Sequence, residues 1–166
     1  MQDTINRLRA KKQDEGFTLI ELLVVVVIIG VLVAIAVPVY LNYREGAADK
    51  SAQSDVRGAI SAGEQFYTNN CNAYPDDMTT PTSTGPVTLT KAAAPSGCTA
   101  VTPGTVPLSA GTSFQYATRT SGSTYVICAS NSGGTRNRVY VYNSANGGSV
   151  KASTATSVAA CITAGA

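Results

Sequence analysis

The fold of this chain is decided at a short boundary segment, residues 16–23, which reads GFTLIELL. A polar stretch, residues 1–16, precedes it. Its glycine is followed by an apolar run, residues 17–41, in which Glu21 is the single charged side chain. As a helix, such a run is roughly 37 Å long, which exceeds the roughly 30 Å of hydrocarbon in a bilayer. The sequence therefore predicts a membrane-spanning helix followed by a domain in water.

Basic side chains before the apolar run orient this helix in the membrane. They are Arg7, Arg9, Lys11 and Lys12. The positive-inside bias keeps their end in the cytoplasm and the C-terminal part outside. The alternative is an ordinary secretory signal peptide with a cleavage site at residues 34–36, which read AIA. Against it, the run exceeds the usual apolar length of about 7–15 residues, and such a peptide has no use for Glu21.

The helical pattern continues to about residue 70 and becomes amphipathic. Small and apolar residues recur at spacings of three, four or seven, which indicates one buried face. This stripe consists of Ala48, Ala52, Val56, Ile60 and Tyr67. The charged side chains are expected on the other faces: Arg44, Glu45, Asp49, Lys50, Asp55, Arg57 and Glu64. We expect this outer half, residues 42–70, to lie against a sheet.

The remainder, residues 71–166, is predicted to be a small β-rich head. Prolines end the helical period, and extended runs follow that alternate with Gly-containing turns. The runs cover residues 113–118, 123–129 and 138–142 and predict an antiparallel meander. In the last run, alternation places Val139 and Val141 together, which suits a sheet with one buried face. The predicted fold class is α+β.

The composition argues against an enzyme and against nucleic acid as the main partner. The chain contains no His and no Trp, and its formal net charge is +2. Without His it lacks the commonest general base and the commonest metal ligand. A nearly balanced charge gives no electrostatic footprint for nucleic acid. We therefore expect no catalytic residue, no metal and no cofactor.

The boundary segment resembles the prepilin class of the type IV pilin and type II secretion pseudopilin family. The basic leader, Gly16, Phe17, Thr18, Glu21 and the apolar run occur together, as they do in that family. The resemblance implies that residues 1–16 are a leader peptide, which a membrane-embedded aspartic peptidase removes between Gly16 and Phe17 before methylating Phe17. It also implies the type IV pilin fold, whose long helix has a protruding apolar half and packs on a small disulfide-bonded head.

Glu21 needs a partner, because a carboxylate in an apolar helix costs roughly 2.5–3.5 kcal/mol on insertion scales. Cleavage would create one in the ammonium group of Phe17. The resemblance implies that Glu21 meets the ammonium of a neighbouring subunit, which would set the axial register of a filament. The alternative is that Glu21 only stabilises the positive end of its own helix, by under about 1 kcal/mol.

Gly30 and Pro38 are expected to weaken the apolar helix. Proline lacks an amide hydrogen and its ring opposes the carbonyl four residues back, so the helix should kink or loosen there. Both residues match the helix-weakening positions of the family, which implies that the stretch can unwind inside a filament. The alternative is a static bend in the membrane.

Four cysteines, Cys71, Cys98, Cys128 and Cys161, follow the apolar run. Their wide spacing disfavours a zinc site, and their placement favours disulfides in an oxidising compartment. The residues alone leave three pairings open. The resemblance implies a C-terminal loop closed by Cys128 and Cys161, which leaves Cys71 with Cys98. Each bond would stabilise the head by roughly 3–4 kcal/mol.

Three arginines of the head, Arg119, Arg136 and Arg138, form a second candidate surface. The same segments contain Tyr125, Tyr140 and Tyr142. A face that combines the two residue types could bind single-stranded nucleic acid. The alternative is an exposed sheet face that contacts neighbouring subunits in a filament.

The expected function is structural polymerisation. The family implies as partners copies of the chain itself, the prepilin peptidase and methyltransferase, an inner-membrane assembly platform with its ATPase, and minor pilins. The precursor would cross the bacterial inner membrane once, and the product would lie in an extracellular pilus. Two alternatives stay open: a type II secretion pseudopilin, which the C-terminal disulfide loop disfavours, and a membrane-tethered binding module that never polymerises.

Overall fold

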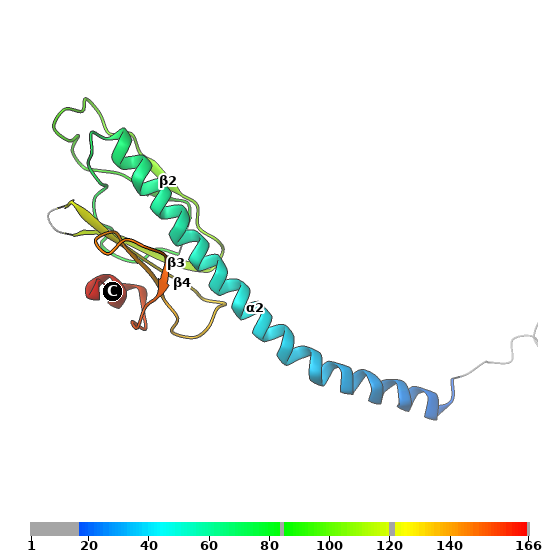
Figure 1. Ribbon diagram of the computed structural model, residues 1–166. Helices are drawn as coiled ribbons and strands as arrows, with labels where there is room; N and C mark the ends of the chain where they lie inside the picture. Colours follow the sequence, from blue (N-terminus) through cyan, green and yellow to red (C-terminus); the bar gives the residue numbers. More distant parts are fainter. Residues whose placement is uncertain (1–16, 84, 120–121, 166) are drawn as a thin grey trace, which may run out of the picture. The chain divides into compact units, whose positions relative to one another are not determined.

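The computed structural model describes residues 17–83, 85–119 and 122–165. The chain divides into two compact units, Met1–Leu41 and Asn42–Ala166. Helix α2 (Leu19–Asn69) runs through most of the described part of the first unit and opens the second (Figure 1). The apolar run and the amphipathic stretch therefore belong to one helix, as their periodicity predicts.

Helix α2 ends where its last residues are tied to a distant loop. Asn70 is fully buried, and its side-chain amide donates to the carbonyl of Thr102 at 3.0 Å. In return, its amide oxygen accepts the N–H of Thr102 at 2.7 Å. Cys71 and Asn72 then adopt left-handed conformations, with φ values of 53° and 60°. This terminus is held by tertiary hydrogen bonds, without the glycine that commonly ends a helix.

The second unit contains a four-stranded antiparallel sheet in the order β3-β4-β5-β6. Its strands are β3 (Thr112–Arg119), β4 (Thr124–Asn131), β5 (Tyr140–Asn143) and β6 (Lys151–Ala152). The register places Phe114 opposite Ala129 and Cys128 opposite Val141. The predicted antiparallel meander is confirmed, with one short strand in addition.

A two-stranded sheet lies in the proline-rich connection between α2 and β3. Strand β1 (Val87–Leu89) pairs with β2 (Gly104–Val106). A Cβ at Gly104 would lie 3.5 Å from the ring of Phe66, so this sheet approaches α2 closely. The connection therefore contributes side chains to the core: Val87, Leu89 and Val106.

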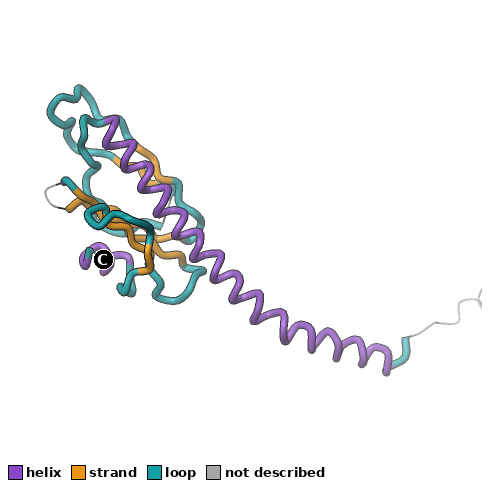
Figure 2. The backbone as a smooth tube through the Cα atoms, in the orientation of Figure 1, coloured by secondary structure: helices purple, strands orange, loops and turns teal. Residues whose placement is uncertain are grey.

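Both faces of the four-stranded sheet are covered, which corrects the expectation of a single buried face. Ile127 belongs to a cluster shared with α2, whereas its neighbour Val126 belongs to a cluster shared with α3 (Val158–Ala164). Tyr140 and Val139 are accordingly 4% and 1% exposed. Figures 1 and 2 show the sheet between the C-terminal part of α2 and the short helix α3. The alternation of side chains along a strand shows which residues share a face of the sheet. Whether that face is buried depends on which other element of the chain packs against it.

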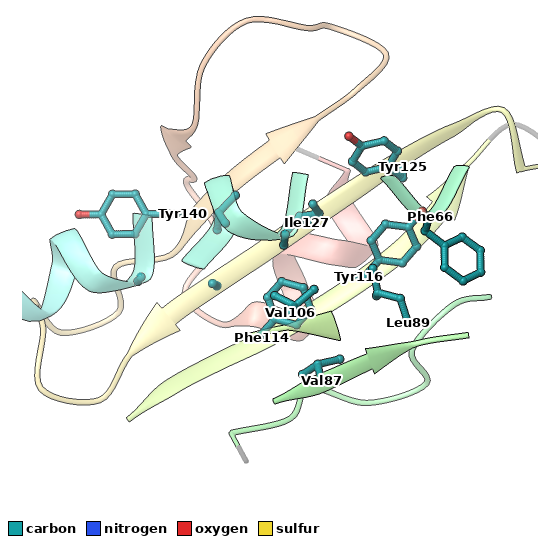
Figure 3. Packing of buried hydrophobic residues seen from close by; sticks show 13 residues of the cluster. Phe66, Val87, Leu89, Val106, Phe114, Tyr116, Tyr125, Ile127 and Tyr140 are labelled. Atoms are coloured by element: carbon teal, nitrogen blue, oxygen red, sulfur yellow. The ribbon is translucent and has the colours of Figure 1, made fainter. Parts of the chain in front are cut away.

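The larger cluster joins α2, the four-stranded sheet and the two-stranded sheet in one core. Figure 3 shows its labelled side chains gathered between these elements. They are Phe66, Val87, Leu89, Val106, Phe114, Tyr116, Tyr125, Ile127 and Tyr140, and Ala52, Val56 and Ala59 of α2 belong to the same cluster. The predicted α+β class is confirmed, with the outer half of α2 packed on an antiparallel sheet.

Candidate functional site

The start of α2 is a reciprocal cap between Thr18 and Glu21. The backbone N–H and the hydroxyl of Thr18 both donate to Oε2 of Glu21 at 2.8 Å. The N–H of Glu21 donates in return to the hydroxyl oxygen of Thr18 at 3.3 Å. Such a capping box satisfies backbone donors that a helix start leaves free. Its sequence signature is the Thr-x-x-Glu spacing of Thr18 and Glu21.

The cap pairs Glu21 with Thr18 of its own chain. Of the two roles expected for Glu21, this contact corresponds to stabilising the start of its own helix and not to binding a neighbouring subunit. Only one carboxylate oxygen is used: Oε1 accepts no hydrogen bond from the described residues. Because Glu21 is also exposed, this oxygen is open to a second donor. Helix capping and recognition of another subunit are therefore compatible at the same side chain.

The apolar half of α2 is exposed along its whole described length. Its large apolar side chains are between 47% (Val24) and 90% (Leu19) exposed. The helix is long and apolar enough to cross a membrane, with a mean hydropathy of 3.3 over an 18-residue window. A continuous apolar surface of this extent marks contact with lipid or with another protein.

The predicted cleavage site lies at the edge of the described residues. Phe17 precedes the cap and is 87% exposed. Gly16 and the rest of the leader, residues 1–16, lie outside the described residues. Helix α2 itself is continuous across Gly30 and Pro38. A Cβ at Gly30 would meet no atom within 4 Å, so packing within the described chain does not require a glycine there.

Two carboxylates of α2 are buried, which corrects the expectation that they lie on its exposed faces. Asp49 and Asp55 are only 6% and 7% exposed. Asp49 accepts the N–H and the hydroxyl of Thr135 at 3.1 and 2.7 Å. Asp55 accepts the same two groups of Ser109 at 3.0 and 2.9 Å. A buried carboxylate is tolerated where paired donors compensate its charge, and here each also fixes a head loop to α2.

Glu64 makes a third connection from α2 to the head. It accepts the hydroxyl of Tyr125 at 2.7 Å and that of Tyr74 at 3.2 Å. The rings of these two tyrosines lie 4.9 Å apart. Burial, assisted by the Glu64 carboxylate, raises the pKa of Tyr74 to about 12 and also raises the pKa of Tyr125. Both phenols therefore remain protonated donors at neutral pH.

Two disulfides close loops of the head. Cys71, just after α2, is bonded to Cys98. Cys128 of β4 is bonded to Cys161 of α3, and both of these residues are fully buried. These are the pairs that the resemblance implied. The second bond anchors α3 to the face of the sheet that it covers.

The three candidate arginines do not share a face with the tyrosines. Tyr125 and Tyr140 are buried in the core beneath α2. Arg119 donates a hydrogen bond to the carbonyl of Ile162 in α3. Arg136 and Arg138 are exposed in the turn that follows β4. The expectation of a joint basic and aromatic face is therefore wrong, because α2 covers the aromatic side of the sheet.

Part of the chain is similar to known proteins. Residues 11–37 match the family described as the prokaryotic N-terminal methylation motif. The type II secretion system core protein G of Pseudomonas aeruginosa is 42% identical over 65 residues, 39% of this chain and 45% of that protein. The type IV major pilin protein PilE of Neisseria gonorrhoeae is 39% identical over 66 residues, 40% of this chain and 39% of that protein.

A third relative, the type IV major pilin protein PilA of Myxococcus xanthus, is 36% identical over 59 residues, 36% of this chain and 27% of that protein. The chain thus spans less than half the length of each of these relatives. No solved structure matches it. By their names, these relatives are two type IV major pilins and a type II secretion system core protein, which confirms the family resemblance.

Proposed function

We propose that this chain, which is homologous over part of its length to type IV pilins and type II secretion pseudopilins, is a structural subunit of a type IV pilus-like filament. The observation that supports this most is the exposed apolar half of α2, which starts at a single capped carboxylate. An apolar helix of this kind can exchange lipid for copies of itself, because both environments keep its side chains out of water.

The proposal divides the chain into four parts: a leader, residues 1–16, a membrane and polymerisation segment, residues 17–41, an amphipathic segment, residues 42–70, and a head, residues 71–166. The precursor crosses the bacterial inner membrane once, with its N-terminus in the cytoplasm. A prepilin peptidase and methyltransferase cuts after Gly16 and methylates Phe17. Support comes from the methylation motif at residues 11–37 and from the apolar length of α2.

Assembly then depends on Glu21. Its free oxygen, Oε1, receives the N-terminal ammonium of Phe17 from a neighbouring subunit, while Oε2 keeps the cap with Thr18. The charge pair offsets the penalty for holding a carboxylate among apolar side chains. Gly30 and Pro38 allow the helix to loosen in the filament. An inner-membrane platform, its ATPase and minor pilins complete the machinery.

The test begins with intact mass and N-terminal sequencing of material sheared from cells. A chain that begins at methylated Phe17 and is found in filaments supports the proposal. A chain that begins at Val37, or that keeps Met1 and stays in the membrane, refutes it and favours a secreted or tethered binding module.

A pair of variants separates recognition from capping. Glu21→Gln keeps an oxygen that can accept from Thr18 but removes the charge, so we expect processing without filaments. Thr18→Val removes the hydroxyl of the cap and keeps the charge, so filaments should persist. Filaments from Glu21→Gln at the wild-type level would show that the charge pair does not drive assembly.

A second candidate function is that of a type II secretion pseudopilin, which the 42% identity to core protein G favours. The disulfide that closes the C-terminal loop favours the pilus instead. Deletion of the gene distinguishes them. Loss of surface filaments with normal secretion indicates a pilus, and retained exoproteins in the periplasm indicate a pseudopilus.

A further inference from the structure

A groove of about 430 Å³ lies in the head, where the turn after β4 faces the start of α3. Residues 130–132 and 134–139 line it, together with residues 156–159. Its volume falls within the range of about 300–1,000 Å³ that is usual for small-molecule sites. It involves none of the residues that the assembly proposal uses, so it stands independently of that proposal.

The groove contains two cations without a counter-ion. Arg136 and Arg138 line it, and neither forms an ion pair with any described residue. The chain contains no acidic residue beyond Asp77. The acidic side chains from residue 46 onward already accept hydrogen bonds from the head itself: Asp49, Asp55, Glu64, Asp76 and Asp77. No described carboxylate pairs with these two guanidinium groups, so both are available to bind an anion.

The side of the groove that carries the arginines is held rigidly before any ligand arrives. Thr135 is bound to the buried carboxylate of Asp49, and the N–H of Arg138 donates to the carbonyl of Thr135 at 3.1 Å. Asn137, between the two arginines, adopts a left-handed φ of 58° that completes the turn. The opposite side is fixed because the Cys128–Cys161 disulfide ties α3 to β4. A site built this way loses little conformational entropy on binding.

The rest of the lining decides what kind of anion fits. Residues that carry a hydroxyl group also line the groove: Ser113, Ser130, Ser132, Thr135, Thr156 and Ser157. The hydroxyl of Thr135 already donates to Asp49, and that of Ser157 already accepts the N–H of Ala160. No aromatic side chain is among the described residues that line the groove, so it offers no platform for stacked bases. We propose that the groove binds an acidic saccharide, whose acidic group meets Arg136 and Arg138 and whose hydroxyl groups meet the Ser and Thr side chains.

The experiment uses the full chain, labelled with ¹⁵N in detergent micelles, at about 0.15 M salt so that nonspecific charge attraction is screened. Trigalacturonate is the acidic probe, and maltotriose is its neutral counterpart. We expect trigalacturonate to shift the amide signals of residues 130–138 and 156–159 saturably, and maltotriose to leave them in place. Arg136→Gln with Arg138→Gln should weaken the affinity at least about tenfold.

Arg57→Gln is the matched control, because it removes one exposed positive charge from α2, outside the groove. It should leave the affinity for trigalacturonate unchanged, and signals outside the groove should coincide in all variants. If the double variant does not fold, each single arginine substitution must still weaken binding.

Three results would overturn the proposal: unchanged affinity in the arginine variants, equal binding of maltotriose, or no saturable shift. A fourth is a stronger shift of the same signals by oligothymidylate, which would reassign the groove to nucleic acid.

Discussion

The carboxylate of Asp49, buried in α2, accepts both the N–H and the hydroxyl of Thr135, a residue 86 positions further along the chain. Asp55 repeats the arrangement with Ser109. The helix is thus fastened to the head at two points where a charge meets paired donors, in addition to the apolar contacts of Val56 and Phe66.

We expect Asp49→Ala to lower the free energy of unfolding by about 2–3 kcal/mol, because hydrogen bonds to a charged acceptor are lost from a buried site. Urea unfolding of the full chain in detergent micelles, followed by the near-ultraviolet circular dichroism of the tyrosines, measures this. Glu45→Ala is the control, since Glu45 is exposed and forms no hydrogen bond with the described residues. Equal stability of the two variants would contradict a structural role for Asp49.

Gly134→Ala should destabilise the head, because a Cβ at this position would overlap the carboxylate of Asp49. The overlap involves a side chain, so the effect should depend on Asp49. In the Asp49→Ala background the same substitution should cost at least about 1 kcal/mol less, as residues in contact are energetically coupled. A double-mutant cycle measures the coupling. Strict additivity would show that Gly134 is needed for another reason.

Alkaline pH should weaken the connection between Tyr74 and Glu64. The folded-state pKa of Tyr74 is raised to about 12, chiefly by burial, from an unfolded value of about 10. Its contribution to stability is therefore complete below pH 10 and is lost as the pH rises from about 10 to 12. We expect Tyr74→Phe to be less stable than the wild type at pH 8, by about 0.5–1.5 kcal/mol.

This difference should shrink between about pH 10 and pH 12, because only the wild type loses the contribution of Tyr74 there. Stability is measured by urea unfolding across this range. Tyr43→Phe, which removes an exposed phenol, is the control and should not reproduce the narrowing. A constant difference at all pH values would rule out titration of Tyr74 as the cause.

The two disulfides should differ in their resistance to reduction. Cys71 is exposed, whereas Cys128 and Cys161 are both fully buried between β4 and α3. Under native conditions, dithiothreitol should open Cys71–Cys98 at least about tenfold faster, because the buried bond must wait for local unfolding. Alkylation followed by peptide mass spectrometry identifies which bond opens. Reduction at equal rates would mean that α3 detaches readily from the sheet.

Replacing each pair by serine tests what the bonds contribute. Cys128→Ser with Cys161→Ser should lower the free energy of unfolding by roughly 3–4 kcal/mol and expose the face of the sheet under α3. The Cys71–Cys98 bond closes a loop of similar length, so Cys71→Ser with Cys98→Ser is the matched comparison. A larger loss from that pair would place the more important constraint in the connection after α2.

Much of the architecture could be predicted from local patterns. The apolar run and the amphipathic repeat define one long helix, and the extended runs locate β3, β4 and β5 within about two residues. The cap formed by Thr18 and Glu21 also has a local signature, a Thr-x-x-Glu spacing directly before an apolar run. These features depend on neighbours a few residues apart, so the residues carry them without any tertiary context.

The burial of polar side chains could not be predicted from such local patterns. Asp49 and Asp55 read as solvent-exposed charges because a helical period reports only that they lie off the apolar stripe. Whether such a face meets water or a head loop depends on donors that lie 54 and 86 residues away. Likewise, the strand pattern predicted burial only for the face of Val139, which α3 covers, whereas Tyr140 on the other face is buried beneath α2.

The long helix, its apolar half and the motif at its start follow from the residues alone, because hydrophobic length and short-range spacing act locally along the chain. Tertiary packing is what buries Asp49 and Asp55, positions Arg136 and Arg138, and places Tyr125 and Tyr140 beneath α2. Each of those outcomes rests on the approach of segments distant in sequence, and the free energy of burying a charge or an aromatic ring is set by what arrives to cover it.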